Sequence, residues 1–306
     1  MATVKVFAAG RPSRRQEAPG VSRNFAFLPG RGTARPRIWI LTPSAGSLVW
    51  PGLGGRRRRM QTSTLVVRGD ELDRSGAVSP AKLLSYCEGA RWLALGQGGP
   101  LAVLFSGGHK VLVRAQRAQI GQPARLGAKL TSTVWLASVG RTSLELGQQL
   151  VDESGAMVAR LLLTVVHLGP EGRPVPVPAE LAALAIGRGE LEGLAAWTLG
   201  QEAPPADAFA FHFFVRASEI DLFQHVNHAR YLDYFLDAKV FGDRGGQHTD
   251  WPEAAPLREV VLDYAAEAVI GEVVGAALWA DGEPGVLHAA LVREGKVLCR
   301  GLLRFG

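Results

Sequence analysis

The chain has 306 residues, of which 47% are apolar and 20% charged, as in a globular protein with room for two domains. No window offers the roughly 20 uncharged apolar residues that a membrane-spanning helix needs. The net charge of +6 arises at one end. Residues 1–60 hold 12 Lys or Arg and one acid, a local charge of +11, whereas residues 61–306 hold 22 bases and 27 acids, or −5. Because the body is mildly acidic, we expect no nucleic-acid partner.

Residues 1–60 are rich in Arg, Gly, Pro and Ser and show no sustained period, which predicts a disordered basic leader. Three origins stay open: an upstream start with Met60 as the true first residue, which we favour, an organelle transit segment, or a basic arm. No secretory pattern is present. Together with the wide spacing of Cys87 and Cys299, this indicates a cytoplasmic protein with two buried free thiols.

The first half of the body is predicted to contain one helix among strands. A short strand, TSTLVVRG, precedes a helix that opens at Pro80, where proline is tolerated in a first turn, and runs to about Leu95. Turn signals then separate four strand-like runs, at residues 109–120, 125–138, 142–151 and 157–167.

A Pro-rich stretch divides this half from the next. Residues 169–207 are predicted to be a linker, and a linker of this length is expected to pack partly on a domain. The same order of elements then returns: a strand (208–216), a helix (227–241) and four strands (257–268, 271–280, 286–293 and 297–305).

The two halves are related by an internal repeat. Residues 215–239, VRASEIDLFQHVNHARYLDYFLDAK, align without a gap on residues 67–91, VRGDELDRSGAVSPAKLLSYCEGAR, at a shift of 148. The sequence therefore predicts an α+β fold of two tandem domains, 61–168 and 208–306, each a curved antiparallel sheet wrapped around one long helix.

The second repeat carries a polar loop ahead of its helix. Asp221, His225 and Asn227 fall within seven residues, and unpaired backbone N–H groups at a helix start can polarise a carbonyl. Each residue also has a non-catalytic explanation: Asp221 as a turn acid, His225 as a loop residue hydrogen-bonded to the backbone, and Asn227 as the helix N-cap. We read Glu71 and Glu219 as solvated charges at strand ends.

The loop EIDLFQHVNH (219–228), followed by an aromatic-rich helix and a run of strands, resembles the hotdog-fold thioesterases. The tandem arrangement is similar to the acyl-ACP thioesterases, whose loop reads DLDxNQHVNN, and the looser likeness extends to acyl-CoA thioesterases of the 4-hydroxybenzoyl-CoA type. The resemblance implies two hotdog domains, an apolar tunnel for an acyl chain, and hydrolysis of fatty acyl thioesters without metal or redox cofactor. Its implied partners are acyl-CoA or an acyl carrier protein.

The resemblance also assigns residues. Asp221 falls on the catalytic aspartate, His225 on the histidine, and Glu267, within LDYAAEA, on a further acid. Phe223 replaces an asparagine of the family, a departure from its pattern. On these residues, Asp221 acts as nucleophile or general base, and His225 orients the water or donates a proton to the leaving thiolate. Asn227 and His228 belong to the helix start that supports the oxyanion. Phe223, Tyr231 and Asp73 are the candidate substrate contacts.

The first repeat keeps Asp73 but has Ala77 and Ser79 where His225 and Asn227 stand in the second, and alignment of its second strand sets Arg117 or Ala118 opposite Glu267. We expect it to bind substrate and support the fold, which leaves one active site per chain. Two other functions stay open: a hotdog dehydratase or hydratase, and a non-catalytic acyl-binding protein. The chain is expected to be a monomer that mimics a dimer, or a homodimer.

Overall fold

The computed structural model describes residues 60–306, apart from 96–98, 198, 201–202, 246–250 and 253–254, and the expectations for the leader lie outside the described residues. Within this part of the chain the strands form a single ten-stranded sheet in the spatial order β1-β3-β4-β5-β2-β7-β10-β9-β8-β6, and all its neighbouring strands are antiparallel. The strands are β1 (Met60–Val66), β2 (Lys110–Ile120), β3 (Lys129–Val139), β4 (Ser143–Val151), β5 (Met157–Leu168), β6 (Phe209–Phe214), β7 (Leu257–Tyr264), β8 (Val273–Trp279), β9 (Val286–Arg293) and β10 (Lys296–Phe305).

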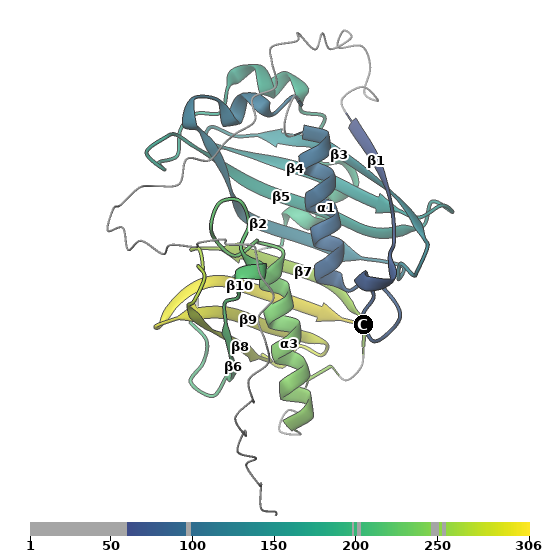
Figure 1. The fold of residues 1–306 in the computed structure, drawn as a ribbon, viewed down its shortest axis with the longest axis vertical. Helices are drawn as coiled ribbons and strands as arrows, with labels where there is room; N and C mark the ends of the chain where they lie inside the picture. The colour runs from purple at the N-terminus through teal and green to yellow at the C-terminus, as the bar shows by residue number, and fades with distance from the viewer. Residues whose placement is uncertain (1–59, 96–98, 198, 201–202, 246–250, 253–254) are drawn as a thin grey trace, which may run out of the picture. The chain divides into compact units, whose positions relative to one another are not determined.

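Two long helices cover one face of this sheet (Figure 1). Helix α1 (Pro80–Leu95) lies across the strands of the first repeat, and α3 (Arg230–Gly245) across those of the second. Both helices contribute to one apolar core that includes Leu84 and Phe235, neither of which is exposed. The structure thus confirms the predicted α+β fold with one long helix against the antiparallel strands of each repeat, and it joins the two expected sheets into one.

The two repeats join edge to edge through β2 and β7. Their register pairs Ala115 with Asp263 and Gln119 with Glu259, so backbone hydrogen bonds continue from one repeat into the other. The core beneath the helices also crosses this pairing. The sheet and the core therefore unite residues that lie far apart in the sequence.

The segment between the repeats packs against the first repeat, as its length suggested. It contains three short 3₁₀ or α-helical turns, η4 (Ala179–Leu184), η5 (Gly189–Leu191) and α2 (Glu192–Ala195). Leu181 is buried against β3, β4 and β5, and Leu191 and Leu194 are buried beside Trp135.

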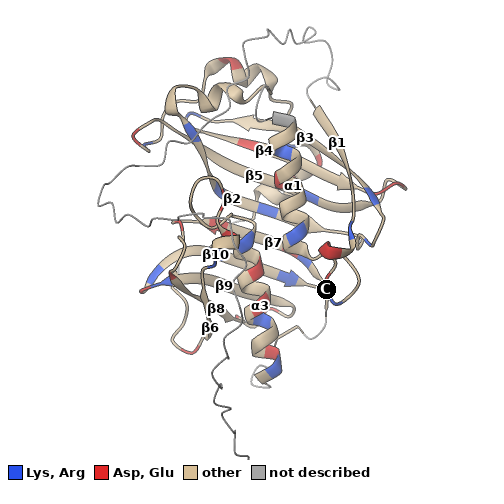
Figure 2. Ribbon diagram, viewed as in Figure 1, with Lys and Arg blue, Asp and Glu red and all other residues tan. Residues whose placement is uncertain are grey.

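Three further 3₁₀ turns shape the loops around the helices: η2 (Gly69–Glu71), η6 (Ala217–Glu219) and η3 (Ala102–Gly108). Acidic and basic residues are interspersed over both repeats (Figure 2). None of the described helices is long and apolar enough to cross a membrane.

Candidate active site

The polar loop of the second repeat is a tight, hydrogen-bonded turn. Asp221 N–H donates to the carbonyl of His225 at 2.9 Å, and Gln224 N–H donates to that of Asp221 at 3.1 Å. Gln224 has a φ of 68°, in the left-handed region that is costly for most residues. The first repeat builds the same turn between Asp73 and Ala77, with Gly76 at a φ of 71°. The backbone of the loop is thus common to both repeats, and its side chains differ.

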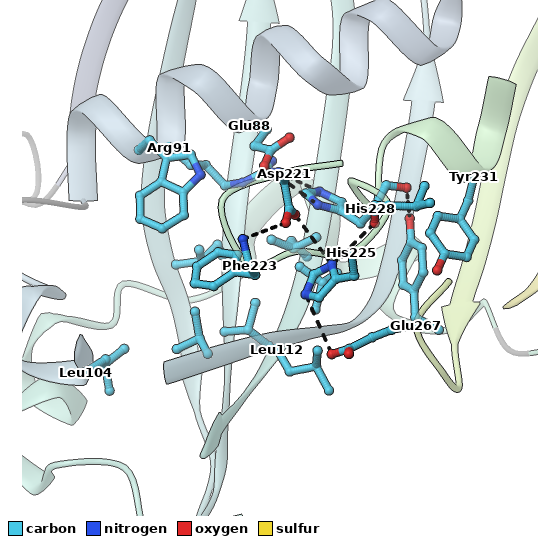
Figure 3. Close-up of a pocket in the computed structure, with 18 of the residues that line it drawn as sticks. Glu88, Arg91, Leu104, Leu112, Asp221, Phe223, His225, His228, Tyr231 and Glu267 are labelled. Carbon is cyan, nitrogen blue, oxygen red and sulfur yellow. Dashed lines mark hydrogen bonds and ion pairs between the residues drawn. The ribbon is translucent and has the colours of Figure 1, made fainter. Parts of the chain in front are cut away.

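In the second repeat this turn aligns three ionisable side chains (Figure 3). His225 Nδ1 lies 3.6 Å from Asp221 Oδ2, and His225 Nε2 lies 3.6 Å from Glu267 Oε1. The side chains of Asp221 and His225 are 17% and 19% exposed, and that of Glu267 is 49% exposed. The structure therefore brings together the three residues that the sequence singled out, with the imidazole between two carboxylates.

Burial raises the pKa of Asp221 above its usual value of 3.8, and the negative charge of Glu88 acts in the same direction. The neighbouring His225 and the N–H of Phe223, which donates to Asp221 Oδ1 at 2.8 Å, lower the pKa in opposition. A carboxylate whose pKa is raised in this way is a stronger base than a solvated one, which suits it to removing a proton from water.

Helix α3 begins three residues later than the expected start at residue 227. The helix begins at Arg230, because residues 227–229 form a turn closed by Asn227 Oδ1, which accepts the N–H of Ala229 at 2.9 Å. Asn227 N–H donates to the carbonyl of Glu219, and Arg230 N–H to that of Asn227. The prediction that the N–H groups from Asn227 to Ala229 polarise a substrate is therefore wrong for Asn227 and Ala229, whose N–H groups are already bonded. Among the described residues of this turn, His228 is the one whose backbone N–H donates to no acceptor.

Helix α1 of the first repeat supplies a polar cluster that meets this turn. Asn227 Nδ2 donates to both oxygens of Glu88, at 3.0 and 2.9 Å. His228 lies between Glu88, at 3.9 Å from its Nδ1, and Arg91, whose Nη2 is 3.4 Å from its Nε2. Burial lowers the pKa of His228 to about 4, so the imidazole is neutral near pH 7 and its Nε2 accepts from Arg91.

A cavity of about 160 Å³ opens beside these groups, comparable to cavities that take up a benzene-sized apolar molecule. Asp221, His225 and Glu267 line it at one side together with Glu88. Much of the remaining wall is apolar and comes from the first repeat: Leu104, Phe105, Leu112, Val113, Leu146 and Val165. The cavity therefore combines Asp221, His225 and Glu267 of the second repeat with Glu88 and most of the apolar wall from the first.

Two of the candidate substrate contacts line this cavity. Phe223 stacks between Trp92 and His225, with ring centroids 6.2 and 6.0 Å away, and is 38% exposed. Tyr231 is buried, and its hydroxyl accepts the N–H of Ala268 at 3.1 Å. The same hydroxyl donates to the carbonyl of Ala266 at 3.4 Å, so Tyr231 holds the backbone on both sides of Glu267.

The third candidate contact, Asp73, does not lie at this cavity. Its Oδ1 accepts from the N–H and hydroxyl of Ser75, and it lines a separate polar cavity together with Lys82 and Arg230. The predicted alignment of Arg117 or Ala118 with Glu267 is also wrong. Val226 N–H bonds to Ala268 O and Val78 N–H bonds to Ala124 O, so the equivalent of Glu267 is Pro123.

The expectation that Glu71 and Glu219 are solvated charges at strand ends is wrong, because neither carboxylate is exposed to solvent and both residues lie in 3₁₀ turns. Glu219 is 6% exposed and accepts from the backbone and guanidinium of Arg216 and from the hydroxyl of Tyr234. Glu71 bonds Arg68 and Tyr86 in the same way. Each carboxylate therefore ties the start of its loop to the helix that follows.

Sequence reasoning missed the contribution of α1. Glu88 and Arg91 lie four and seven residues after the fully buried Leu84, so they share its face of the helix. Charged residues on a face that should be apolar are unusual unless they are paired. That anomaly in the helical pattern was the signal for a polar contact across the repeats.

Comparison with solved structures defines the fold of the protein. An acyl-ACP thioesterase from Bacteroides thetaiotaomicron is 16% identical, with a TM-score of 0.67 over 83% of this chain and 100% of the other. A 12:0-ACP thioesterase from Umbellularia californica is 15% identical, with a TM-score of 0.65 over 83% of this chain and 99% of the other. The chain therefore has the double hotdog fold found in these thioesterases.

A family match and one relative indicate the class of protein. Residues 202–300 match the acyl-ACP thioesterase C-terminal domain. The long-chain acyl-CoA thioesterase FadM of Escherichia coli (strain K12) is 28% identical over 100 residues, which cover 30% of this chain and 76% of the relative. Fold, family match and relative together identify the chain as a thioester hydrolase that resembles the acyl-ACP and acyl-CoA thioesterases.

Proposed function

We propose that this chain hydrolyses fatty acyl thioesters by a water molecule that Asp221 activates. The observation that carries the proposal is the position of the Asp221–His225–Glu267 group at one side of a largely apolar cavity. An acyl chain in the cavity would direct its thioester carbonyl toward the carboxylate. The family match to residues 202–300, the repeat that carries all three residues, supports this assignment.

In the proposed reaction, Asp221 takes a proton from water as the water oxygen attacks the thioester carbon. The carbon–sulfur bond then breaks, and the departing thiolate takes a proton from His225, leaving a free acid and a thiol. The proton that Asp221 took from water then passes to His225, 3.6 Å away, which restores both groups. Glu267 stabilises the positive charge on the imidazole from the side opposite Asp221. Direct attack by Asp221 on the thioester carbon is the other route that this geometry permits.

Charge that develops on the carbonyl oxygen needs a donor aimed at it. We assign this role to the backbone N–H of His228, since the neighbouring N–H groups of Asn227, Ala229 and Arg230 are bonded within the turn. Asn227 is then a residue that shapes the turn, rather than one that touches the substrate.

The substrate carrier and the assignment of the domains are part of the proposal. We propose residues 61–168 as the acyl-binding domain, 169–207 as the linker and 208–306 as the catalytic domain. The acyl group would be carried by an acyl carrier protein or by CoA, the carriers named for the matched family and for the relative FadM. One chain supplies both repeats, so we propose that a cytoplasmic monomer suffices for activity, with no cofactor.

The test uses two matched variants, Asp221→Asn and Asp73→Asn, which change the same position of the two loops. Thiol release is measured from a panel of acyl-CoA and acyl-ACP substrates of different chain lengths. Loss of a general base costs about 100- to 10,000-fold. We expect Asp221→Asn to lose at least about 100-fold in kcat/KM and Asp73→Asn to stay within about threefold of the parent.

Three outcomes would refute the proposal. Equal losses in both variants would mean that the loop aspartates act through folding alone. Hydration of a 2-enoyl thioester without thiol release would identify the dehydratase or hydratase class instead. If the parent binds acyl thioesters and releases no thiol from any of them, the acyl-binding function replaces hydrolysis.

A further inference from the structure

Glu88 lies where the first repeat touches the catalytic turn of the second (Figure 3). It belongs to α1, and its two carboxylate oxygens both accept from the side-chain amide of Asn227, at 3.0 and 2.9 Å. The other end of that amide, Oδ1, accepts the N–H of Ala229. Both ends of the Asn227 side chain are therefore fixed, one by its own turn and one by the neighbouring repeat.

The contact is anchored further into the first repeat. Arg91, one turn beyond Glu88 on α1, is 6% exposed and donates from Nη1 to Gln148 Oε1 at 2.8 Å. Gln148 Nε2 donates in turn to Ser132 Oγ and to the carbonyl of Cys87, at 2.8 and 3.0 Å. A chain of hydrogen bonds thus runs from the sheet of the first repeat through α1 to His228, whose N–H is the proposed oxyanion donor.

The pseudo-symmetric position offers an internal comparison. At the shift of 148 residues, Glu88 corresponds to Leu236 and Asn227 to Ser79, so the amide–carboxylate contact has no counterpart at the Asp73 loop. Lys239, the equivalent of Arg91, bonds to Asp243 of its own helix at 2.8 Å. The polar contact between repeats is therefore specific to the loop that carries Asp221 and His225.

Glu88 also places a negative charge near the reacting groups. The charged or titratable groups that face Asp221 are His225 from its own loop, Glu88 from α1 and, across the imidazole, Glu267. The charge of Glu88 raises the pKa of Asp221, whereas that of His225 lowers it. Removal of the Glu88 charge is thus expected to lower the pKa of Asp221.

We propose that Glu88 is a positioning residue for the hydrolysis: it holds Asn227, and through it the turn that presents Asp221 and the His228 N–H, from the opposite repeat. The inference rests on the proposed function for its catalytic meaning. It assigns the first repeat a part in the chemistry of the second repeat, in addition to its part in the acyl cavity.

The test compares the full chain with Glu88→Gln, Asn227→Ala and the double variant, using the best substrate of the panel between pH 4.5 and 9. A misplaced reacting group costs up to about 100-fold. We expect Glu88→Gln to lower kcat about 10- to 100-fold, to leave KM within about threefold, and to shift the acidic limb of kcat/KM to lower pH. The double variant should be no slower than the slower single variant, because Glu88 acts through Asn227.

Glu88→Asp, which keeps the charge, should recover part of the rate, and thermal unfolding of each variant checks the fold. A pH profile that does not move, or fully additive losses, would overturn the inference and leave Glu88 a structural residue. If Glu88→Gln loses as much activity as Asp221→Asn, the inference is also overturned, because Glu88 would then be a catalytic residue and not a positioning residue.

The two proposals fail separately. If the parent releases thiol and Glu88→Gln matches it, hydrolysis stands and the positioning role falls. If the parent releases none, the proposed function falls, and the unfolding midpoints of the same four proteins still decide whether Glu88 and Asn227 are coupled. Additive effects on the midpoint would refute the contact itself.

Discussion

His228 is a buried imidazole beside the loop that carries Asp221 and His225, and its effect on stability has a definite sign. Its pKa is about 4 in the native state, because burial and the nearby Arg91 and His225 disfavour the cation, against about 6.5 in the unfolded chain. Between these values the unfolded chain binds a proton that the native protein does not. The contribution of His228 to stability is therefore complete above about pH 6.5 and is lost as the pH falls toward 4.

Substitution of His228 by Gln should remove this dependence. We expect the urea midpoint of the parent to fall between pH 7 and pH 5 by more than that of His228→Gln. Asp221 changes stability with pH in the opposite direction. Because its pKa is raised in the native state, its contribution to stability declines as the pH rises from 3.8 through the native pKa. Comparison of the two proteins isolates His228, because Asp221 is present in both. If the urea midpoints of the parent and of His228→Gln fall by the same amount, His228 is not the source of the pH dependence.

At the residue scale, the sequence predicted what lies within the second repeat and missed what crosses between repeats. Asp221 and His225 belong to one loop, and Glu267 belongs to the separate segment LDYAAEA, which places it just after β7 and beside that loop. Glu88 and Arg91 come from a helix more than 130 residues away. No spacing along the chain predicts which helix faces which loop before the sheet order is known.

At the element scale, α1 and α3 each contain a glycine inside the helix, Gly89 and Gly242, and the two have different surroundings, which allows a test of packing. Replacing glycine by alanine in the middle of a helix stabilises it by about 1 kcal/mol when the new methyl group has room. A Cβ on Gly89 meets nothing within 4 Å, whereas a Cβ on Gly242 would overlap the buried ring of Trp251. Overpacking costs about 1–3 kcal/mol, which exceeds the gain in helix propensity.

Gly89→Ala is therefore expected to raise the free energy of unfolding by up to about 1 kcal/mol, and Gly242→Ala to lower it. Urea denaturation of the two variants measures both signs in one experiment. A stabilising Gly242→Ala would mean that Trp251 yields without cost, contrary to the packing seen here.

The elements themselves were largely predictable. The helix expected at 80–95 is confirmed at its bounds, and each expected strand is present with its ends shifted by a few residues. The second helix was expected from residue 227 and begins at Arg230, because the side chain of Asn227 closes a turn that delays it. The order of the strands could not be predicted, since β2 and β7 pair across about 140 residues of chain.

At the scale of the whole molecule, the β2–β7 pairing decides how the protein unfolds. Chains of this size commonly unfold through intermediates, one domain at a time. Here the two repeats share backbone hydrogen bonds and a continuous core, so neither can open without exposing the other. We expect cooperative unfolding of both.

Native-state hydrogen exchange tests this expectation. The slowest amides of β4 and β9, one strand from each repeat, should report the same free energy of opening and the same dependence on denaturant. Protection of β4 that survives after β9 has exchanged would show that the repeats open independently, in which case the shared strand pairing contributes little to cooperativity.

Most of the apolar wall of the cavity comes from the first repeat, whereas Asp221, His225 and Glu267 come from the second, and this has a consequence for how mutations act on each. In a symmetric pair of identical chains, every mutation appears in both halves, so a change that reshapes the acyl wall also alters the chain that carries out the reaction. In a fused chain the two stretches mutate separately. The side chains of Leu112 and Leu146 can thus change, and the apolar wall with them, without any change in the loop that carries Asp221.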